Sequence, residues 1–197
     1  MRPFAGSAAK AALRADAMAR RDAMPAEARA RGSAVIAERA LAIAEPLKPS
    51  VVAVYRAIRT EVVPDAIVDW ALGRGLVVVL PAIEDATTLV FRRYRPGDRL
   101  VAAGLGTVSP TPDAPAIDPD LIVTPMVAFD RAGTRLGHGR GYYDRGVLAL
   151  HAKGLRPTLV GVAFAVQELS AIPSESHDIA MDWIVTEKET IDLRHLG

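Results

Sequence analysis

One stretch of the chain combines the residue types that bind phosphate. Residues 135–145 read Arg-Leu-Gly-His-Gly-Arg-Gly-Tyr-Tyr-Asp-Arg, with glycine at three alternate positions. Glycine adopts backbone angles that other residues avoid, so successive N–H groups can converge on an anion. Arg135, Arg140 and a protonated His138 would add charge-assisted donors. Asp144 could face the magnesium ion that accompanies phosphate. The segment therefore predicts a phosphate site, with an ordinary glycine-rich turn as the alternative.

The segment does not match the common motifs for nucleotide binding or acyl transfer. A P-loop needs Gly, four residues and Gly-Lys-Ser/Thr, and a Rossmann fingerprint starting at Gly137 and Gly139 would need glycine at Tyr142. The chain has no cysteine and no Gly-x-Ser-x-Gly elbow, so covalent acyl catalysis has little support.

The bulk composition fits one globular domain over residues 1–197. Half of the residues are apolar and the net charge is only +1, which argues against a general nucleic-acid partner. The longest apolar run, Leu76–Ile83, is too short to span a membrane. The N-terminus is rich in alanine and arginine like a transit peptide, but Asp16 and Asp22 weaken that reading. A cytoplasmic protein is expected, and the absence of cysteine is compatible with a reducing compartment.

Short apolar runs alternate with helix-favouring segments along the chain. Helices are expected over residues 7–24, 25–45, 64–72 and 142–153, and strands over 51–55, 76–80, 88–93, 121–123, 158–162 and 183–185. Pro46 should end the second helix, and Pro81 should close the second strand. Residues 104–119 carry four prolines and predict a long surface loop, a kind that is often functional. The alternation predicts a three-layer α/β/α fold with a mainly parallel central sheet.

The predicted order places several polar residues where such folds bind ligands. The glycine-rich segment follows a strand and leads into a helix, where an anion site is easily built. Glu61 follows the first strand and could accept a hydrogen bond from a polar heterocycle or be a solvated loop charge. Asp178, in Ser176-His177-Asp178, could be a second carboxylate near magnesium, although its spacing alone favours a surface turn.

The first predicted helix carries a basic face. Lys10, Arg14 and Arg21 fall within roughly 40° of one another at 3.6 residues per turn, while Leu13 and Met18 point elsewhere. A solvated basic face is the alternative to an anion-binding role, and nothing within the helix decides between them.

Together these residues resemble the 5-formyltetrahydrofolate cyclo-ligase family, also called methenyltetrahydrofolate synthetases. The resemblance spans nearly the whole chain and rests on the Lys-x-x-x-Arg pattern of Lys10 and Arg14, Glu61 with Val62, Thr124–Asp130 with Gly133 and Arg135–Arg145, and Ile172–Asp178 with Thr186 and Glu187. Three positions depart from the family pattern. His138 stands where many members carry arginine, Met126 replaces a common glycine, and Ser109-Pro110 replaces Glu-Pro.

The resemblance implies a monomeric ATP- and magnesium-dependent ligase of one-carbon metabolism. ATP would phosphorylate the formyl oxygen of 5-formyltetrahydrofolate, N10 would attack the activated carbon, and loss of phosphate would give 5,10-methenyltetrahydrofolate and ADP. Such chemistry needs positioning and charge stabilisation rather than a protein nucleophile.

The resemblance also implies roles for single residues. ATP contacts would come from Lys10, Arg14, Arg135, Leu136, Gly137, His138, Gly139, Arg140, Gly141, Tyr142 and Tyr143. Folate contacts would come from Arg56, Glu61, His138, Gly139, Arg140, Gly141 and Tyr142. Asp144 and Asp178 would bind magnesium, and Arg140 and Tyr142 would be the catalytic residues.

Two other functions remain open at this point. Sugar-phosphate isomerases and CoA transferases share the general α/β layout, although none of their motifs is present, and a requirement for ATP would separate them. A folate- or nucleotide-binding regulator without catalysis would bind the ligands but form no product.

Overall fold

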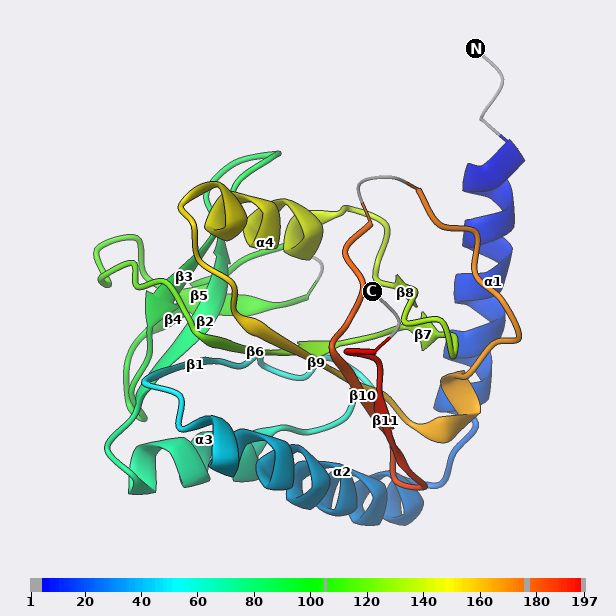
Figure 1. Cartoon of the computed structure of the whole chain (residues 1–197), viewed down its shortest axis with the longest axis horizontal. Helices are drawn as coiled ribbons and strands as arrows, with labels where there is room; N and C mark the ends of the chain where they lie inside the picture. Colours follow the sequence, from blue (N-terminus) through cyan, green and yellow to red (C-terminus); the bar gives the residue numbers. More distant parts are fainter. Residues whose placement is uncertain (1–4, 105, 176–177, 196–197) are drawn as a thin grey trace.

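A seven-stranded sheet forms the centre of the protein (Figure 1). The computed structural model describes residues 5–104, 106–175 and 178–195. The strands in spatial order are β11 (Thr190–Asp192), β10 (Trp183–Val185), β9 (Thr158–Val162), β6 (Leu121–Pro125), β1 (Val51–Ala53), β2 (Val77–Ile83) and β3 (Leu89–Arg93). The inner strands run parallel, and β3 and β11 pair antiparallel at the two edges. The predicted mainly parallel sheet is therefore confirmed.

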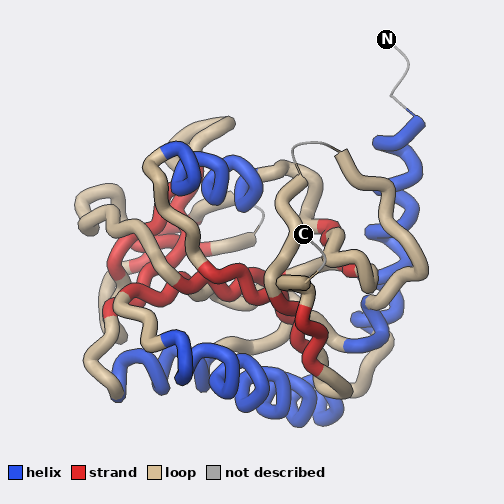
Figure 2. The backbone as a smooth tube through the Cα atoms, viewed as in Figure 1, coloured by secondary structure: helices blue, strands red, loops and turns tan. Residues whose placement is uncertain are grey.

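Helices cover both faces of the sheet, as Figure 2 shows. The helices α2 (Ala26–Leu47) and α3 (Asp65–Gly73) lie on one face, and α4 (Tyr142–Ala152) lies on the other (Figure 1). Alternate strand residues supply the two cores: Val52 and Val54 pack with α2 and α3, whereas Ala53 packs in the core that includes α4. Strands that are buried on both faces read as continuous apolar runs, which is how the sequence marks them.

The first helix and two hairpins lie outside these layers. The helix α1 (Ala5–Asp22) packs against β7 (Ala128–Phe129) and the 3-10 turn η1 (Ala165–Gln167). The strand β7 pairs with β8 (Arg135–Leu136), and β4 (Leu100–Ala102) pairs with β5 (Val108–Pro110). The sequence analysis predicted none of β4, β5, β7, β8 and β11, which are too short to show a hydrophobic period. The strands β1 and β10 are equally short, but they were predicted from the apolar runs that contain them.

The order of the strands creates a crevice in the middle of the sheet. The chain passes from β1 through α3 to β2 on one side, and from β6 through α4 to β9 on the other. The adjacent strands β1 and β6 therefore begin connections that diverge over opposite faces. Ligands in open α/β sheets bind beyond the carboxyl ends of the strands at such a switch point.

The prediction that Pro81 closes the second strand was wrong. Pro81 lies inside β2, opposite Phe91 of β3. The Phe91 carbonyl points away from β2 and accepts a hydrogen bond from the Ile117 N–H. Pro81 and Phe91 therefore exchange no hydrogen bond with each other. The neighbouring strand β1 has ended by then, and a residue without an N–H therefore costs the ladder nothing.

Two other boundaries also differ from the prediction. The expected loop over residues 104–119 contains β5, which pairs with β4 and contacts β2 and β3. The helix α2 continues to Leu47, with Pro46 in its last turn and Lys48 in a left-handed conformation at the cap. Pro46 therefore sits within the helix it was expected to end.

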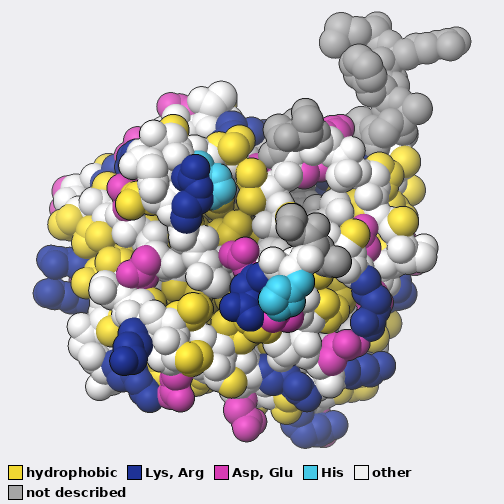
Figure 3. Space-filling model, viewed as in Figure 1, with side chains coloured by type: hydrophobic (Ala, Val, Ile, Leu, Met, Phe, Trp, Pro, Cys, Tyr) yellow, Lys and Arg dark blue, Asp and Glu magenta, His cyan; other side chains and the backbone are white. Residues whose placement is uncertain are grey.

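Charged side chains of both signs are interspersed over the described residues on the face in Figure 3. No helix within the described ranges is long and apolar enough to cross a membrane.

Candidate active site

A cleft of about 340 Å³ opens at the carboxyl ends of β1, β2 and β6. Its walls include Tyr55 and Glu61 after β1, Ile83 at the end of β2, and Thr124 and Pro125 at the end of β6. The volume falls in the range of roughly 300–1,000 Å³ that small-molecule sites occupy. The cleft thus lies at the switch point of the sheet.

The cleft brings together every site residue that the sequence predicted. Those lining it are Lys10, Arg14, Arg56, Glu61, Arg135, Leu136, Gly137, His138, Gly139, Arg140, Gly141, Tyr142, Tyr143, Asp144 and Asp178. They come from α1, from the segment after β1, from β8, the loop after it and the first turn of α4, and from the segment before β10. His177, which preceded Asp178 in the predicted polar patch, lies outside the described residues.

The glycine-rich loop, residues 137–141, takes a conformation that only glycine adopts easily. Gly139 has φ of 86° and Gly141 has φ of 61°, both in the left-handed region. Gly141 is also the N-cap of α4, and no side-chain cap occurs there among the described residues. The first N–H groups of α4 therefore remain available at the cleft, and the helix dipole favours an anion there.

The two cations of α1 that reach the cleft are already engaged. Lys10 Nζ lies 3.0 Å from Asp178 Oδ2 and 3.6 Å from a Glu175 oxygen. Arg14 Nε donates to the Gly137 carbonyl at 2.8 Å. A Cβ on Gly139 would stand 3.3 Å from the Arg14 Cζ atom, so the glycine allows the guanidinium to cross the loop.

Arg21 shares the helical face of Lys10 and Arg14 but does not line the cleft. Its side chain is buried, with a residue exposure of 1%, and Arg21 Nε donates to Thr60 Oγ1 at 3.0 Å. Arg21 thus ties the end of α1 to the segment that carries Glu61. The sequence could place the three cations on one face, but only packing shows that the last of them is internal.

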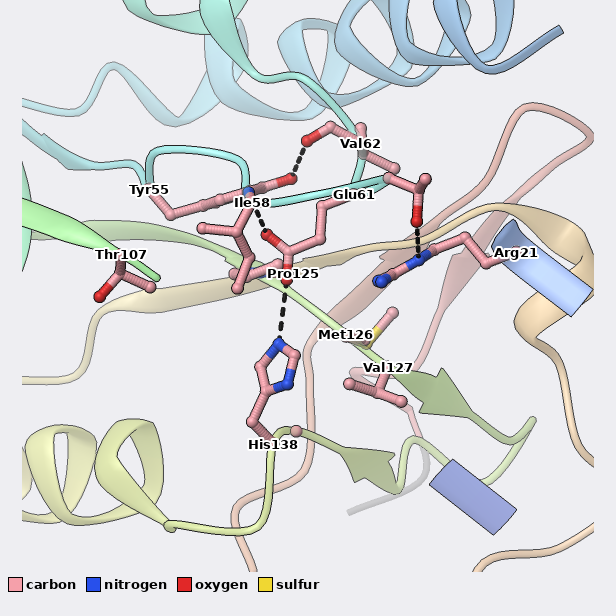
Figure 4. Close-up of polar contacts among 12 residues, drawn as sticks. Arg21, Tyr55, Ile58, Glu61, Val62, Thr107, Pro125, Met126, Val127 and His138 are labelled. Atoms are coloured by element: carbon pink, nitrogen blue, oxygen red, sulfur yellow. Dashed lines mark hydrogen bonds and ion pairs between the residues drawn. The ribbon is translucent and has the colours of Figure 1, made fainter. Parts of the chain in front are cut away.

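Glu61 and His138 meet across the cleft, as Figure 4 shows. Glu61 Oε2 accepts the Ile58 N–H at 3.0 Å, and Glu61 Oε1 lies 3.1 Å from His138 Nε2. The Glu61 side chain is only 5% exposed, against 31% for that of His138. Because an ionised carboxylate only accepts hydrogen bonds, Nε2 is the protonated nitrogen of the imidazole in this contact.

A second internal pair joins Arg135 to Asp144. Arg135 Nη2 donates to Asp144 Oδ1 at 2.7 Å, and the Ile179 N–H donates to the same oxygen at 3.1 Å. The side chains are 7% and 18% exposed, so removing one partner would leave a poorly solvated charge. Asp144 Oδ2 accepts no hydrogen bond within the described ranges.

Arg140 differs from the other cations of the cleft. Its side chain is exposed and makes no hydrogen bond or ion pair with a described residue. Its backbone is nevertheless held, because Arg145 Nη2 donates to the Arg140 carbonyl at 2.8 Å and the Arg145 guanidinium lies 5.1 Å from the centre of the Tyr142 ring.

Arg56 lies at the opposite wall of the cleft. Its Nη1 atom lies 3.2 Å from Asp65 Oδ1.

The two tyrosines that flank Glu61 are held in their neutral form. Desolvation, followed by the nearby Glu61 carboxylate, raises the pKa of both Tyr55 and Tyr143 well above its ordinary value. Tyr55 donates its hydroxyl hydrogen to the Val62 carbonyl at 2.5 Å. Neither phenol is therefore placed to act as a base near neutral pH.

The sequence prediction missed part of the cleft wall. The additional lining residues are Tyr55, Ile58, Pro81, Ile83, Leu89, Ala103, Thr107, Val108, Thr124, Pro125 and Glu175. Thr124 and Pro125 begin the signature stretch, and Thr107 and Val108 belong to the segment expected to be a functional loop. The sequence therefore held signals that could have placed these four residues in the site. The other apolar members carried no separate signal.

Comparisons with known proteins identify the family of the chain. The model of the 5-formyltetrahydrofolate cyclo-ligase family matches residues 6–187. A 5-formyltetrahydrofolate cyclo-ligase of Mycolicibacterium smegmatis is 39% identical over 135 residues, which cover 64% of this chain and 68% of the relative. One of Escherichia coli K12 is 33% identical over 141 residues, covering 68% of this chain and 76% of the relative.

The fold also matches a solved structure over most of its length. The NMR structure of Aquifex aeolicus 5,10-methenyltetrahydrofolate synthetase superposes with a TM-score of 0.78 at 31% identity, covering 94% of this chain and 93% of that chain. A synthetase from Mycoplasma pneumoniae shares the fold at 21% identity with a TM-score of 0.74. Family model, relatives and fold agree, and the chain belongs to the 5-formyltetrahydrofolate cyclo-ligase family.

Proposed function

We propose that the cleft closes 5-formyltetrahydrofolate to 5,10-methenyltetrahydrofolate with ATP. The formyl oxygen takes the γ-phosphoryl group, and ADP is released. N10 then attacks the formyl carbon and loses its proton, and the C–O bond breaks as inorganic phosphate leaves. One observation carries the proposal: the cationic glycine-rich loop and the buried carboxylate of Glu61 face one cleft, so a phosphate and a polar heterocycle can be held side by side.

The phosphates of ATP are assigned to the glycine-rich loop and α1. The uncapped start of α4 supplies N–H donors, and Lys10, Arg14 and Arg140 supply positive charge around them. Phosphoryl transfer between two anionic ligands depends on such charge and on in-line positioning. Arg140 and Tyr142 border the place where the formyl oxygen would meet ATP, and the proposal makes them the catalytic residues.

The folate heterocycle is assigned to the opposite wall. Glu61 is a buried acceptor suited to the N–H groups of a pterin, and Arg56 stands at the mouth of the same wall. Apolar side chains such as Ile83 and Leu89 line the cleft beside it and suit the flat ring. The proposal treats residues 1–197 as one domain, since the strands of the sheet come from residues 51 to 192.

Magnesium is proposed to lie between the phosphates and the two carboxylates Asp144 and Asp178. The donor set fits, because magnesium prefers oxygen ligands and is commonly held by one or two carboxylates together with substrate phosphates. The described residues contain no group of three or more candidate metal ligands, which suits an ion that arrives with ATP. When bound, the ion would neutralise charge on the phosphates, while Arg135 and Lys10 orient the carboxylates.

The reaction is tested by mixing the protein with 5-formyltetrahydrofolate and Mg-ATP and following the absorbance of the methenyl product. We expect product only when ATP is present. Product formation without ATP would refute the proposed phosphorylation step. Binding of both ligands without product would instead support a non-catalytic regulator.

A further inference from the structure

The contact between Glu61 and His138 joins the two halves of the cleft. Glu61 belongs to the wall proposed to receive the heterocycle, and His138 lies in the glycine-rich loop proposed to hold phosphate. The two residues are 77 positions apart, and Glu61 Oε1 lies 3.1 Å from His138 Nε2. A single side-chain contact therefore ties the phosphate loop to the folate wall.

The two oxygens of Glu61 face different partners. Oε2 accepts the backbone N–H of Ile58 at 3.0 Å, which belongs to the fixed wall. Oε1 faces His138 from the fixed wall (Figure 4), and the proposal assigns this oxygen to the heterocycle. With the imidazole in place the Glu61 side chain is only 5% exposed, so a substrate N–H that approaches Oε1 from the cleft has to displace the imidazole that covers it.

The Glu61 wall is the better anchored of the two sides. Tyr55 donates to the Val62 carbonyl at 2.5 Å, and the buried Arg21 donates to Thr60 at 3.0 Å, so both neighbours of Glu61 are fixed (Figure 4). The glycine-rich loop is exposed at residues 137–140, and besides His138 its side-chain tethers among the described residues are hydrogen bonds from Arg14 to the Gly137 carbonyl and from Arg145 to the Arg140 carbonyl, on either side of residues 138 and 139. Release of His138 would therefore move the loop rather than the wall.

We propose that His138 and the folate heterocycle compete for Glu61 Oε1, and that substrate binding releases the glycine-rich loop to close on ATP. His138 is then a positioning residue that acts through Glu61 and couples the two ligands. The inference rests on the proposed function. A ligand shifts a conformational balance only by binding one state more tightly than the other. Here the hydrogen bond that the substrate forms with Oε1 replaces the one that holds the loop in place.

The test measures binding rather than turnover. The dissociation constants of 5-formyltetrahydrofolate and of a non-hydrolysable ATP analogue are determined by calorimetry, each with and without the other ligand. In the wild type we expect each ligand to tighten the other by the same factor, because binding coupling is reciprocal. A hydrogen bond to a charged group that is partly open to solvent suggests a factor of roughly three to ten.

Three variants separate competition from direct substrate contact. His138→Ala is expected to tighten 5-formyltetrahydrofolate by roughly three- to tenfold and to abolish the coupling. His138→Gln keeps an N–H donor and should restore part of both effects. His151→Ala, in α4 and away from the cleft lining, is the matched control and should behave as wild type.

Two results would overturn the inference. Weaker folate binding in His138→Ala would show that the imidazole contacts the substrate directly. Coupling of wild-type size in His138→Ala would show that the loop is not released through this contact. Neither result touches the proposed reaction, which fails separately if the wild type forms no methenyl product with ATP.

Discussion

Replacement of Arg140 by methionine is the sharpest test of the phosphate assignment. The Arg140 side chain is exposed and makes no hydrogen bond or ion pair with a described residue, so its removal breaks no internal contact. Arg145 still holds the Arg140 carbonyl at 2.8 Å in the variant, because that contact uses only the backbone. The change should therefore remove charge from the cleft without moving the loop.

The expected loss of activity follows from the one hydrogen bond to phosphate that Arg140→Met would remove. A hydrogen bond to a charged group contributes about 1.5–3 kcal/mol, and every 1.36 kcal/mol is about tenfold in rate. We expect kcat/KM for ATP to fall by roughly 10- to 150-fold. The free energy of unfolding should change by less than about 0.5 kcal/mol, as for other surface substitutions.

The assay follows methenyl absorbance at varied ATP, with thermal unfolding of the same samples. Arg95→Met is the matched control, because Arg95 is exposed and does not line the cleft. Arg140→Lys would show how much of the effect needs the guanidinium fork rather than charge alone. If Arg140→Met kept kcat/KM for ATP within about twofold of wild type, the assignment of Arg140 to phosphate would be wrong.

Three further predictions concern the metal, the core and a turn. Asp144→Asn should raise the magnesium concentration needed for half-maximal turnover, since an amide binds the ion more weakly than a carboxylate; an unchanged titration would remove Asp144 from the metal site. Gly161→Ala should lower the free energy of unfolding by about 1–3 kcal/mol, because its Cβ would stand 2.5 Å from Met126 Sδ. In chemical denaturation, the double variant with Met126→Ala should recover part of the stability lost by Gly161→Ala. If the two single changes in free energy of unfolding simply added, the predicted clash with Met126 would be wrong. Asp85 accepts hydrogen bonds from Thr87 and Thr88, which lower its pKa from 3.8 to about 2. This turn should contribute stability above pH 3.8 and lose it as the pH falls through about 2, and a carboxyl titration by NMR with a midpoint near 4 would refute it.

Local patterns were enough to predict the helices and the main sheet strands that frame the site, but not β5 and β8. Strands buried on both faces appear in the sequence as apolar runs such as residues 76–80 and 158–162. The glycines of residues 137–141 indicate a backbone with positive φ angles. The order of strands and helices also predicted the parallel sheet and hence the edge at which the cleft lies. The antiparallel direction of β3 and the position of Pro81 inside β2 were not predicted, because both depend on which strand pairs with which.

The identities and spacing of residues determined the family, and the resemblance to that family supplied part of the set of side chains that line the cleft. Tertiary structure alone decided how they meet: Lys10 with Asp178, Glu61 with His138, and Arg21 turned inward from a face it shares with two cleft residues. Backbone conformation and helical facing follow from neighbours along the chain, so a sequence can carry them. Partners separated by 77 or 168 positions meet only when helices and sheet have packed, and packing is a property of the whole chain.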